Sequence, residues 1–301
     1  MYKCLIYGIG DMFYNCFNQV EYEVQRRNIE IVGYVSKDRK ATSFGVKGGK
    51  SKLIDIEEAL ANIQWDYCIV FSEDFIKEKM ELQKIRIAED KIINGKVFKI
   101  IGFDFEKYIE IKADNLTIIS NDCWGGNMYN LLGMRFNSPF INCIVEINEY
   151  LTMLEDLKYY INSELKMERD GDIYKCQAPI GYLGEGDRKI HIRFNHHIKF
   201  EQAKKDWDRR KARVNFNNIF VKININDGDS TKMEKFKSLQ LANKVAFVPK
   251  DFHIYTSRLY NGNLKGGIES FPAYIRDMYS LQKEIDILSM LLGEKDYFRE
   301  C

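Results

Sequence analysis

Three features are scarce in this chain of 301 residues: long apolar runs, paired cysteines and an excess of charge of one sign. No run approaches the ~18 consecutive apolar residues that a membrane-spanning helix requires. The first residues, Met1–Gly8, lack the basic start and the long apolar segment of a secretory signal. The sequence therefore predicts no integral membrane segment, and we expect a cytoplasmic protein.

Charge and cysteine content exclude two further classes. Lys and Arg number 45 against 44 for Asp and Glu, a formal net charge of +1, so no overall field attracts a nucleic acid. The 7 cysteines include no Cys-x-x-Cys pair, the spacing that zinc and dithiol redox sites commonly use. We expect free thiols in a reducing compartment and no nucleic-acid partner.

The domain organisation follows from length and from the lack of linkers. With only 4 prolines and no Ser-, Gly- or Pro-rich tract, the chain must join its domains by a short connection. Domains usually run to roughly 100–200 residues, so the length favours two of them. We predict a Rossmann-like domain of nucleotide-binding type at residues 1–112 and a second α/β domain at residues 113–301.

Strands and helices alternate along the predicted first domain. Buried strands are predicted at Lys3–Tyr7, Ile29–Val35, Tyr67–Phe71 and Val97–Ile101, with helices from Gly10 to about Arg27 and at Asp55–Asn62 and Asp74–Ile92. This alternation is typical of a mostly parallel sheet with ligand-binding loops at the carboxyl ends of its strands.

The predicted second domain has the same class of pattern. Strands are predicted at Leu116–Ser120, Lys189–Phe194, Ile219–Ile225 and Lys244–Val248, and helices at Glu146–Leu165 and Phe200–Val214. A last helix is predicted between Pro272, near its start, and Gly293, just past its end. Both halves of the chain are therefore α/β.

A glycine motif, Gly8-Ile9-Gly10, lies between the first strand and the first helix. Dinucleotide-binding domains use glycines there to let the backbone approach a pyrophosphate. Here Phe13 replaces the third glycine, and Ser36-Lys37-Asp38 follows the second strand where an acidic contact to ribose is typical. Gly8 and Gly10 are candidate residues for binding a nucleotide or NAD(P). The alternative is a tight turn that binds nothing.

A second glycine-containing segment, Asn121–Gly126, directly follows a buried strand, where α/β proteins bind ligands. Gly125 and Gly126 would let the backbone fold closely around a ligand, and amides of the next helix would receive an anion. Trp124 would stack on a sugar or base, and Asn121 would bind substrate. The alternative is a glycine turn whose Trp124 fills the core.

The same segment carries two reactive side chains. Asp122 is a candidate acid, base or metal ligand. Cys123 is a candidate substrate-binding residue, and its position near a helix N-terminus predicts the lowered pKa of a nucleophile. Its histidine partner cannot be identified from the sequence.

A histidine pair follows the strand Lys189–Phe194, which alternates in polarity. One face carries Ile190, Ile192 and Phe194 and the other carries His191, Arg193 and Asn195. His196 and His197 are adjacent and should point in different directions, so a two-His metal site within the pair is not expected. His196 is a candidate catalytic acid or base. The alternative is a solvated strand end with a satisfied histidine.

Arg210 lies on the helix Phe200–Val214, three residues after Trp207 and beside the apolar stripe of that helix. An inward guanidinium next to an indole suits a clamp on phosphate or carboxylate, and Arg210 is a candidate substrate-binding residue. Arg209 and Arg213 should project toward solvent. The alternative is an arginine lying over apolar surface.

The loop Asn226–Thr231 contains a carboxylate pair, Asp227 and Asp229, at the end of a buried strand. Such a pair can hold a divalent metal against a diphosphate, and Asp227 is the candidate ligand. Asp-Gly-Asp is also ordinary turn chemistry.

Two resemblances accompany these motifs. The first hundred residues or so, with Ile6-Tyr7-Gly8-x-Gly10, Ile31–Val35 and Asp66–Val70, resemble the N-terminal domains of bacterial sugar-modifying proteins, which bind nucleotide-sugars or nicotinamide cofactors. Residues of about 115–252 resemble a bacterial family labelled exopolysaccharide-biosynthesis proteins, through Asn121–Gly126, Ser138-Pro139-Phe140, His196 and Trp207–Arg210.

The second resemblance adds Ser138 to the candidate substrate-binding residues, but it is not complete around the histidines. Lys189, Arg193 and His197 stand where that family has Asp, His and Tyr, so only Phe194 and His196 carry over.

Three hypotheses of function follow. The first is a transferase acting on a nucleotide-linked or phosphorylated sugar in bacterial surface or exopolysaccharide biosynthesis. The second is a non-catalytic partner of that pathway, which senses a nucleotide or docks another protein or a second copy of itself. The third is an NAD(P)-dependent reductase.

Overall fold

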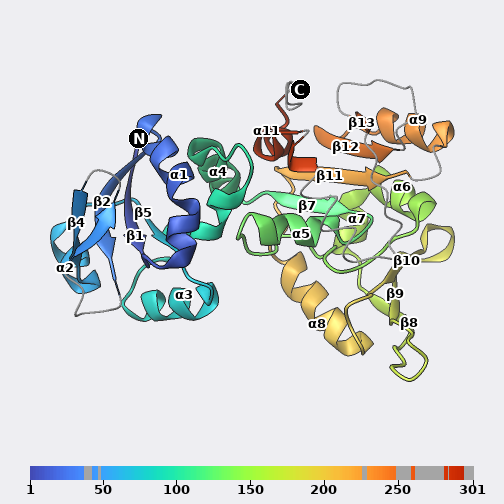
Figure 1. Ribbon diagram of the computed structural model, residues 1–301. Helices are drawn as coiled ribbons and strands as arrows, with labels where there is room; N and C mark the ends of the chain where they lie inside the picture. The colour runs from blue at the N-terminus through green and yellow to red at the C-terminus, as the bar shows by residue number, and fades with distance from the viewer. Residues whose placement is uncertain are drawn as a thin grey trace. The chain divides into compact units, whose positions relative to one another are not determined.

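The computed structural model describes residues 1–36, 43–46, 49–225, 229–248, 259–261, 281–283 and 285–294. The chain divides into two compact units (Figure 1). Unit 1 comprises Met1–Ile109 and Leu131–Gly133, and unit 2 comprises Glu110–Asn130 and Met134–Cys301. The division lies near the predicted boundary after residue 112, and it assigns a short segment of the predicted second domain to unit 1.

Unit 1 is built on one sheet with the strand order β3-β4-β2-β1-β5-β6. Its strands are β1 (Tyr2–Tyr7), β2 (Ile29–Val35), β3 (Ser43–Val46), β4 (Gly49–Ile54), β5 (Tyr67–Val70) and β6 (Ile92–Asn94). All neighbours are parallel except β3 and β4, which form an antiparallel pair at one edge. The predicted parallel α/β sheet is confirmed.

Two helices of unit 1 begin at aspartate caps. The helices of this unit are α1 (Asp11–Gln25), α2 (Ile56–Asn62), α3 (Phe75–Lys84) and the 3-10 turns η1 (Glu89–Lys91) and η2 (Gly95–Lys99), and α4 (Phe105–Ala113) begins in this unit. Asp55 accepts a hydrogen bond from the amide of Glu57 and starts α2, and Asp74 accepts one from Lys77 and starts α3.

The predicted strand Val97–Ile101 is wrong, because most of this segment is the 3-10 turn η2. The edge strand β6 precedes it, and the Asn94 side chain accepts a hydrogen bond from the amide of Lys96 and starts the turn. Val97 and Phe98 are buried in either conformation. A short apolar run shows that a segment is buried, but it does not distinguish a strand from a helical turn.

Unit 2 contains two sheets. A parallel sheet has the order β13-β12-β11-β7, and an antiparallel sheet has the order β10-β9-β8. Their strands are β7 (Thr117–Ser120), β8 (Lys166–Arg169), β9 (Ile180–Leu183), β10 (Ile190–Arg193), β11 (Ile219–Asn224), β12 (Asn243–Val248) and β13 (Leu259–Asn261). Unit 2 is therefore also α/β, with an antiparallel hairpin, β8–β9, that was not predicted.

The helices of unit 2 are α5 (Trp124–Leu131), α6 (Ile147–Glu155), α7 (Leu157–Asn162), the 3-10 turn η3 (Gly186–Arg188), α8 (Phe200–Lys211), α9 (Ser230–Ser238) and α11 (Ile287–Leu292). Gly293 ends α11 with a φ of 74°, as predicted. The predicted start near Pro272 is wrong for this helix, because Asp286 has an extended backbone and caps α11, and Pro272 itself lies outside the described residues. No helix in the described ranges combines the length and the apolar character needed to cross a membrane.

The predicted helix Glu146–Leu165 is two helices, because the chain breaks at Asp156. This residue has a φ of −142°, and its carboxylate accepts a hydrogen bond from the amide of Tyr159 and starts α7. The buried stripe survives the break and comprises Tyr150, Leu151, Leu154, Leu157, Ile161 and Leu165. The stripe joins a core that also contains Trp207 of α8 and Val221 of β11.

Candidate functional site

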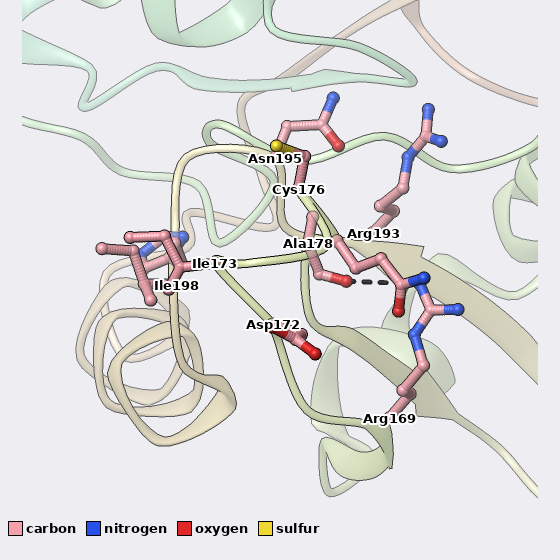
Figure 2. Close-up of a pocket in the computed structure, with 10 residues that line it drawn as sticks. Arg169, Asp172, Ile173, Cys176, Ala178, Arg193, Asn195 and Ile198 are labelled. Atoms are coloured by element: carbon pink, nitrogen blue, oxygen red, sulfur yellow. Dashed lines mark hydrogen bonds between the residues drawn. The ribbon is translucent and has the colours of Figure 1, made fainter.

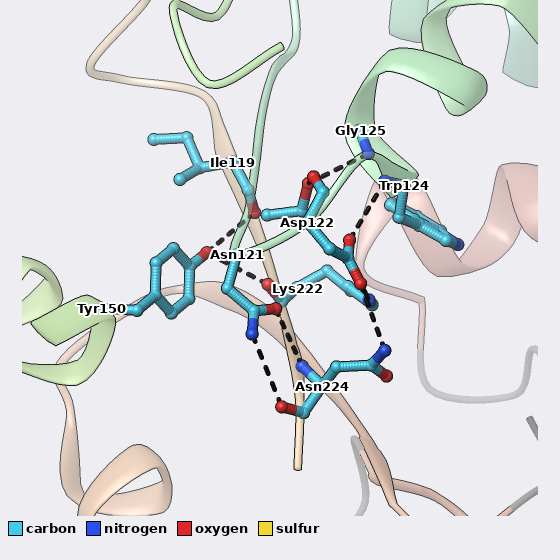
Figure 3. A network of polar contacts seen from close by, with 9 residues as sticks. Ile119, Asn121, Asp122, Trp124, Gly125, Tyr150, Lys222 and Asn224 are labelled. Carbon is cyan, nitrogen blue, oxygen red and sulfur yellow. Dashed lines mark hydrogen bonds and ion pairs between the residues drawn. The ribbon is translucent and has the colours of Figure 1, made fainter. Parts of the chain in front are cut away.

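A buried ion pair joins the carboxyl ends of two neighbouring strands in unit 2. Lys222 of β11 lies 2.6 Å from Asp122, which follows β7 (Figure 3). The side chain of Asn224 donates to the same carboxylate oxygen at 3.1 Å, and the amide of Trp124 donates to the other at 3.0 Å. Both oxygens of Asp122 are thus engaged.

Burial lowers the pKa of Lys222, and the negative charge of Asp122 opposes this shift. The ammonium group also lies over two aromatic rings, 5.2 Å from the centroid of Phe247 and 5.9 Å from that of Trp124. Asp122 is only 4% exposed. The Asp122 carboxylate therefore holds the 121–126 loop in place. Both of its oxygens are engaged in these contacts, so neither is available for the catalytic role predicted for this residue.

Asn121 ties the same loop to β11. Its side-chain oxygen accepts a hydrogen bond from the amide of Asn224 at 3.0 Å, and its side-chain nitrogen donates to the carbonyl of Asn224 at 3.5 Å. The amide group is occupied within the protein, so the structure shows Asn121 as a tether between strand ends and not as an open substrate contact.

Trp124 lies in the interior and is 2% exposed. Its ring stacks on Phe220 at 6.0 Å and meets Phe247 edge-on at 5.7 Å. The indole packs the core, which is the alternative that the sequence left open, and it does not offer a face to a sugar. An aromatic side chain buries so much apolar area that core packing is its commoner role.

The two glycines of the loop allow close packing of α5. A Cβ atom on Gly125 would lie 3.0 Å from the Ser120 hydroxyl, and one on Gly126 would lie 3.2 Å from the side chain of Asn142. The amide of Gly125 already donates to Ser120 at 3.0 Å. The space and the amides predicted for a ligand are thus used by the protein itself.

Ser138 is fully buried and belongs to a turn. Its hydroxyl accepts a hydrogen bond from the amide of Phe140 at 3.2 Å. Phe140 in turn packs edge-on against Trp207 at 4.9 Å. The motif Ser138-Pro139-Phe140 therefore shapes the core, and the substrate contact expected of Ser138 is not available in this position.

Cys123 differs from its neighbours, because its side chain meets a histidine from a distant part of the chain. The sulfur lies 3.6 Å from Nε2 of His196, which follows β10. Cys123 is half-buried and His196 is exposed. This contact supplies the partner that sequence reasoning could not identify, and it is the arrangement of a nucleophile beside its base.

The lowered pKa predicted for Cys123 is wrong, because the surroundings hold the thiol in its protonated form. Burial and the nearby charge of Asp122 raise its pKa to about 11, against a smaller opposing effect of Lys222. At neutral pH the sulfur therefore carries its proton. A base must accept that proton during any reaction in which the sulfur attacks, and His196 is within reach.

The second histidine points elsewhere, as predicted. Nε2 of His197 lies 3.2 Å from Asp206 on α8, and Arg210 donates to the same oxygen at 3.2 Å. Burial disfavours the charge of Asp206, but the hydrogen bond from His197 and the charges of Arg210 and Arg209 outweigh it and lower its pKa. Polar contacts thus link His197, the residue after His196, to Asp206 and Arg210 of α8.

Arg210 leans into the protein and is 6% exposed, which confirms the predicted orientation. Its guanidinium lies 5.2 Å from the ring centroid of Phe136, and its Nε has no hydrogen-bond partner in the described part of the chain. Arg213, expected to face solvent, is half-buried instead. Whether Arg210 holds an anion stays a prediction.

A pocket of about 610 Å³ opens between the β8–β9 hairpin and the loop after β10 (Figure 2). It is lined by Arg169, Asp172, Ile173, Cys176, Gln177, Ala178, Arg193, Asn195, His197 and Ile198. Sequence reasoning missed it, although Arg193 and His197 are positions where the chain departs from the family that it resembles. These two differences from the family were the features of the sequence that could have indicated the pocket.

In unit 1, Gly8 and Gly10 of the first loop differ in backbone conformation and in the space around them. Gly8 has a φ of +86°, and a Cβ there would lie 2.4 Å from the carbonyl oxygen of Phe71, whereas Gly10 has open space around it. Phe13, at the place of the third glycine, is fully buried and meets Phe71 edge-on at 5.3 Å. Gly8 serves the packing of the sheet, and cofactor binding at Gly10 stays a prediction.

The predicted metal ligand Asp227 lies outside the described residues. Its neighbour Asp229 caps α9 and accepts hydrogen bonds from the amides of Thr231 and Lys232. Backbone hydrogen bonds, chiefly that from Thr231, lower the pKa of Asp229. No group of three or more His, Cys, Asp or Glu side chains suited to a metal ion occurs in the ranges that the structure describes.

Comparison with known proteins divides the chain in a similar way. A family model described as "Domain of unknown function (DUF1919)" matches residues 94–291, and one described as "C2185-like, N-terminal" matches residues 1–93. A protein of Haemophilus influenzae described as "Uncharacterized protein" is 28% identical over 171 residues, which is 56% of this chain and 79% of that protein. The first model covers more than half of the chain, including the Cys123–His196 pair and the pocket.

Proposed function

The chain belongs to the family described as a domain of unknown function, DUF1919, and we propose that its second unit is a group-transfer enzyme. The proposed substrate is a phosphorylated or nucleotide-linked sugar, and the proposed setting is bacterial surface or exopolysaccharide biosynthesis. The observation that carries the proposal is the 3.6 Å contact between the Cys123 sulfur and Nε2 of His196.

The chemistry that this pair supports is covalent group transfer. The Cys123 proton moves to His196 while the sulfur attacks the transferred group of the donor, and the departing oxygen takes that proton from His196. An acceptor hydroxyl then gives its proton to His196, and its oxygen replaces the sulfur. The departing sulfur takes the proton held by His196, and the resting thiol is restored.

The remaining residues of the loop hold the sulfur in place. The buried pair of Asp122 and Lys222 fixes the segment before Cys123, and the packing of Gly125 on Ser120 fixes the segment after it. A nucleophile needs such a rigid support, because an error of about 1 Å in its position costs a large part of the rate. The choice of a sugar substrate is supported by the resemblance to exopolysaccharide-biosynthesis proteins.

The proposal is tested by turnover of a panel of nucleotide-linked sugars and sugar phosphates by the full-length protein, with and without Mg²⁺ or Mn²⁺. Release of nucleotide or phosphate is followed by ion-exchange chromatography. We expect Cys123→Ser and His196→Asn to lower the rate by about 100-fold or more. His191→Asn is the matched control, because His191 pairs with Glu149 at 2.7 Å and not with Cys123. Absence of turnover across the panel, or full activity of both variants, would contradict the proposal.

A second candidate, a docking protein without catalysis, is favoured by exposed apolar side chains on and near the β8–β9 hairpin. They are Met167, Ile173, Tyr174 and Ile198, and Tyr174 is 96% exposed. Isolated exposed apolar residues are common, but several together mark protein-binding surfaces. For a docking protein, Tyr174→Ser would abolish polysaccharide production in cells while Cys123→Ser would leave it unchanged. An enzyme would show the opposite pattern.

A further inference from the structure

We infer that the pocket between the β8–β9 hairpin and residues 195–198 binds the phosphate group of the substrate. The inference rests on the proposed function for the identity of the ligand as a sugar derivative, but it concerns other residues. Its evidence is the charge, the burial and the shape of the pocket lining.

Neither arginine of the lining has a carboxylate partner in the part of the chain that the structure describes. Among the described residues, Arg193 makes no ion pair, and the Arg169 guanidinium donates only to the carbonyl of Ala178, at a long 3.4 Å. The lysines of the same region are all paired, as Lys166 with Glu185, Lys175 with Asp172, Lys189 with Glu168 and Lys199 with Asp170. Arg169 and Arg193, which line the pocket, are thus the cations of this region that are available to bind an anion.

The one carboxylate of the lining, Asp172, is already compensated. One of its oxygens accepts hydrogen bonds from the amides of Tyr174 and Lys175, at 3.0 and 3.3 Å, and the other lies 3.6 Å from the ammonium of Lys175. These contacts form the turn at the tip of the hairpin. Asp172 therefore shapes the pocket wall without neutralising the arginines.

His197 adds a buried polar atom to the same lining. Its side chain is 10% exposed, and Nε2 lies 3.2 Å from the carboxylate of Asp206. Its Nδ1 is buried and has no partner among the described residues. A buried polar atom without a partner costs free energy, and a hydrogen bond between Nδ1 and a phosphate group would recover it.

The opposite wall suits the uncharged body of such a ligand. Ile173 and Ile198 lie together on one side of the pocket, away from the two guanidinium groups (Figure 2). Gln177 and Asn195 supply amide groups that can hydrogen-bond to hydroxyls. The volume of about 610 Å³ exceeds the need of inorganic phosphate and fits a sugar phosphate or a nucleotide-linked sugar.

The pocket also lies beside the reacting pair in the chain. Asn195 and His197 both line it, and His196, which contacts Cys123, lies between them. Gly171 fixes the hairpin against this loop, since a Cβ there would lie 2.0 Å from the carbonyl oxygen of Ile198. The pocket lining therefore includes both sequence neighbours of His196.

The inference is tested by calorimetric titration of the full-length protein with glucose 1-phosphate, uridine diphosphate glucose, inorganic phosphate and glucose. We expect the two phosphorylated sugars, or one of them, to bind more tightly than inorganic phosphate and glucose to give no heat. Arg193→Gln should weaken binding by roughly 10- to 100-fold, as for the loss of a charge-assisted hydrogen bond. Lys189→Gln, directly before β10 and paired with Glu168, is the matched control and should bind like the parent.

Binding of glucose 1-phosphate identifies a monoester site, and binding of uridine diphosphate glucose alone identifies a diphosphate site. The inference is overturned if neither sugar binds, or if Arg193→Gln binds either as tightly as the parent protein. Cys123→Ser separates the two proposals, because it should abolish turnover and leave binding intact. If Arg193→Gln keeps both its turnover and the parent affinity for the phosphorylated sugars, the proposal for the catalytic pair is retained and the pocket is rejected as the phosphate site.

Discussion

At the scale of single residues, Cys123 combines two properties that seldom occur in an ordinary core cysteine. It is only half-buried, and a histidine nitrogen lies 3.6 Å from its sulfur. Its raised pKa nevertheless indicates a neutral thiol and not a preformed thiolate. The pair is therefore expected to react by proton transfer during the chemical step.

This protonation state predicts how alkylation of Cys123 depends on pH. With a pKa of about 11, the thiolate fraction is very small at pH 7 and grows about tenfold for each pH unit below that pKa. The rate of iodoacetamide labelling, measured on the Cys123 peptide by mass spectrometry, should rise by about that factor per unit from pH 7 to pH 9. A rate that is already constant by pH 8 would instead indicate a thiolate paired with a protonated His196.

A second residue-scale prediction concerns the buried ion pair. Lys222→Met removes the only cation within salt-bridge distance of Asp122 among the described residues and leaves a carboxylate buried. We expect a loss of about 3–5 kcal/mol in the free energy of unfolding, measured by urea titration. The double variant with Asp122→Asn should recover part of that loss, because no uncompensated charge remains.

Lys84→Met is the control for this experiment, since Lys84 pairs with Glu81 on an exposed helix face. Exposed pairs contribute little to stability, so this variant should unfold near the parent midpoint. A double variant as unstable as Lys222→Met alone would show that lost packing of the lysine chain, and not the stranded carboxylate, causes the effect.

At the scale of elements, the turn from β1 to α1 shows that two glycines of one motif have different reasons to be there. Gly8 needs a positive φ and lies where the backbone of Phe71 leaves no room for a Cβ. Gly10 precedes α1 with a φ of −82°, a value open to any residue. Only the first glycine is demanded by the fold.

We therefore expect Gly8→Ala to destabilise the protein by at least about 2 kcal/mol, from the unfavourable φ and the shift of β5 that the new Cβ requires. Gly10→Ala should cost about 1 kcal/mol or less, as at other helix N-caps. Thermal and urea unfolding followed by circular dichroism measure both. Equal losses would mean that the loop around Gly10 is more constrained than its open surroundings indicate.

The elements that the sequence predicted poorly share a physical reason. Strand β8 exposes Met167, Glu168 and Arg169, so it has no alternation of apolar and polar residues to mark it. The predicted helix over 146–165 has a continuous apolar stripe, and only the local backbone at Asp156 divides it. Periodicity reports which face is buried, whereas breaks and edge strands depend on hydrogen bonds to other segments.

At the scale of the whole molecule, the mostly parallel sheet of unit 1 and the parallel sheet of unit 2 each carry their own buried core. One core gathers Leu5, Val35 and Val70 of unit 1, and the other gathers Ile119 and Val221 of unit 2 with the buried face of α6. The candidate chemistry lies in unit 2, within the 94–291 match to the DUF1919 model. The glycine loop of unit 1 falls within the other match, and its cofactor stays a prediction to be tested separately.

The sequence by itself determined the buried strands β1, β2, β5, β7, β10, β11 and β12 and the inward face of α8, including the orientation of Arg210, because hydrophobic periodicity is a local property. It also singled out Cys123 and His196 one by one. Only the tertiary structure decided that these two meet across 73 residues, that Asp122 meets Lys222 across 100, and that Arg169 and Arg193 share a pocket. Such contacts depend on strand order and on the paths of loops, which no local pattern of side chains encodes.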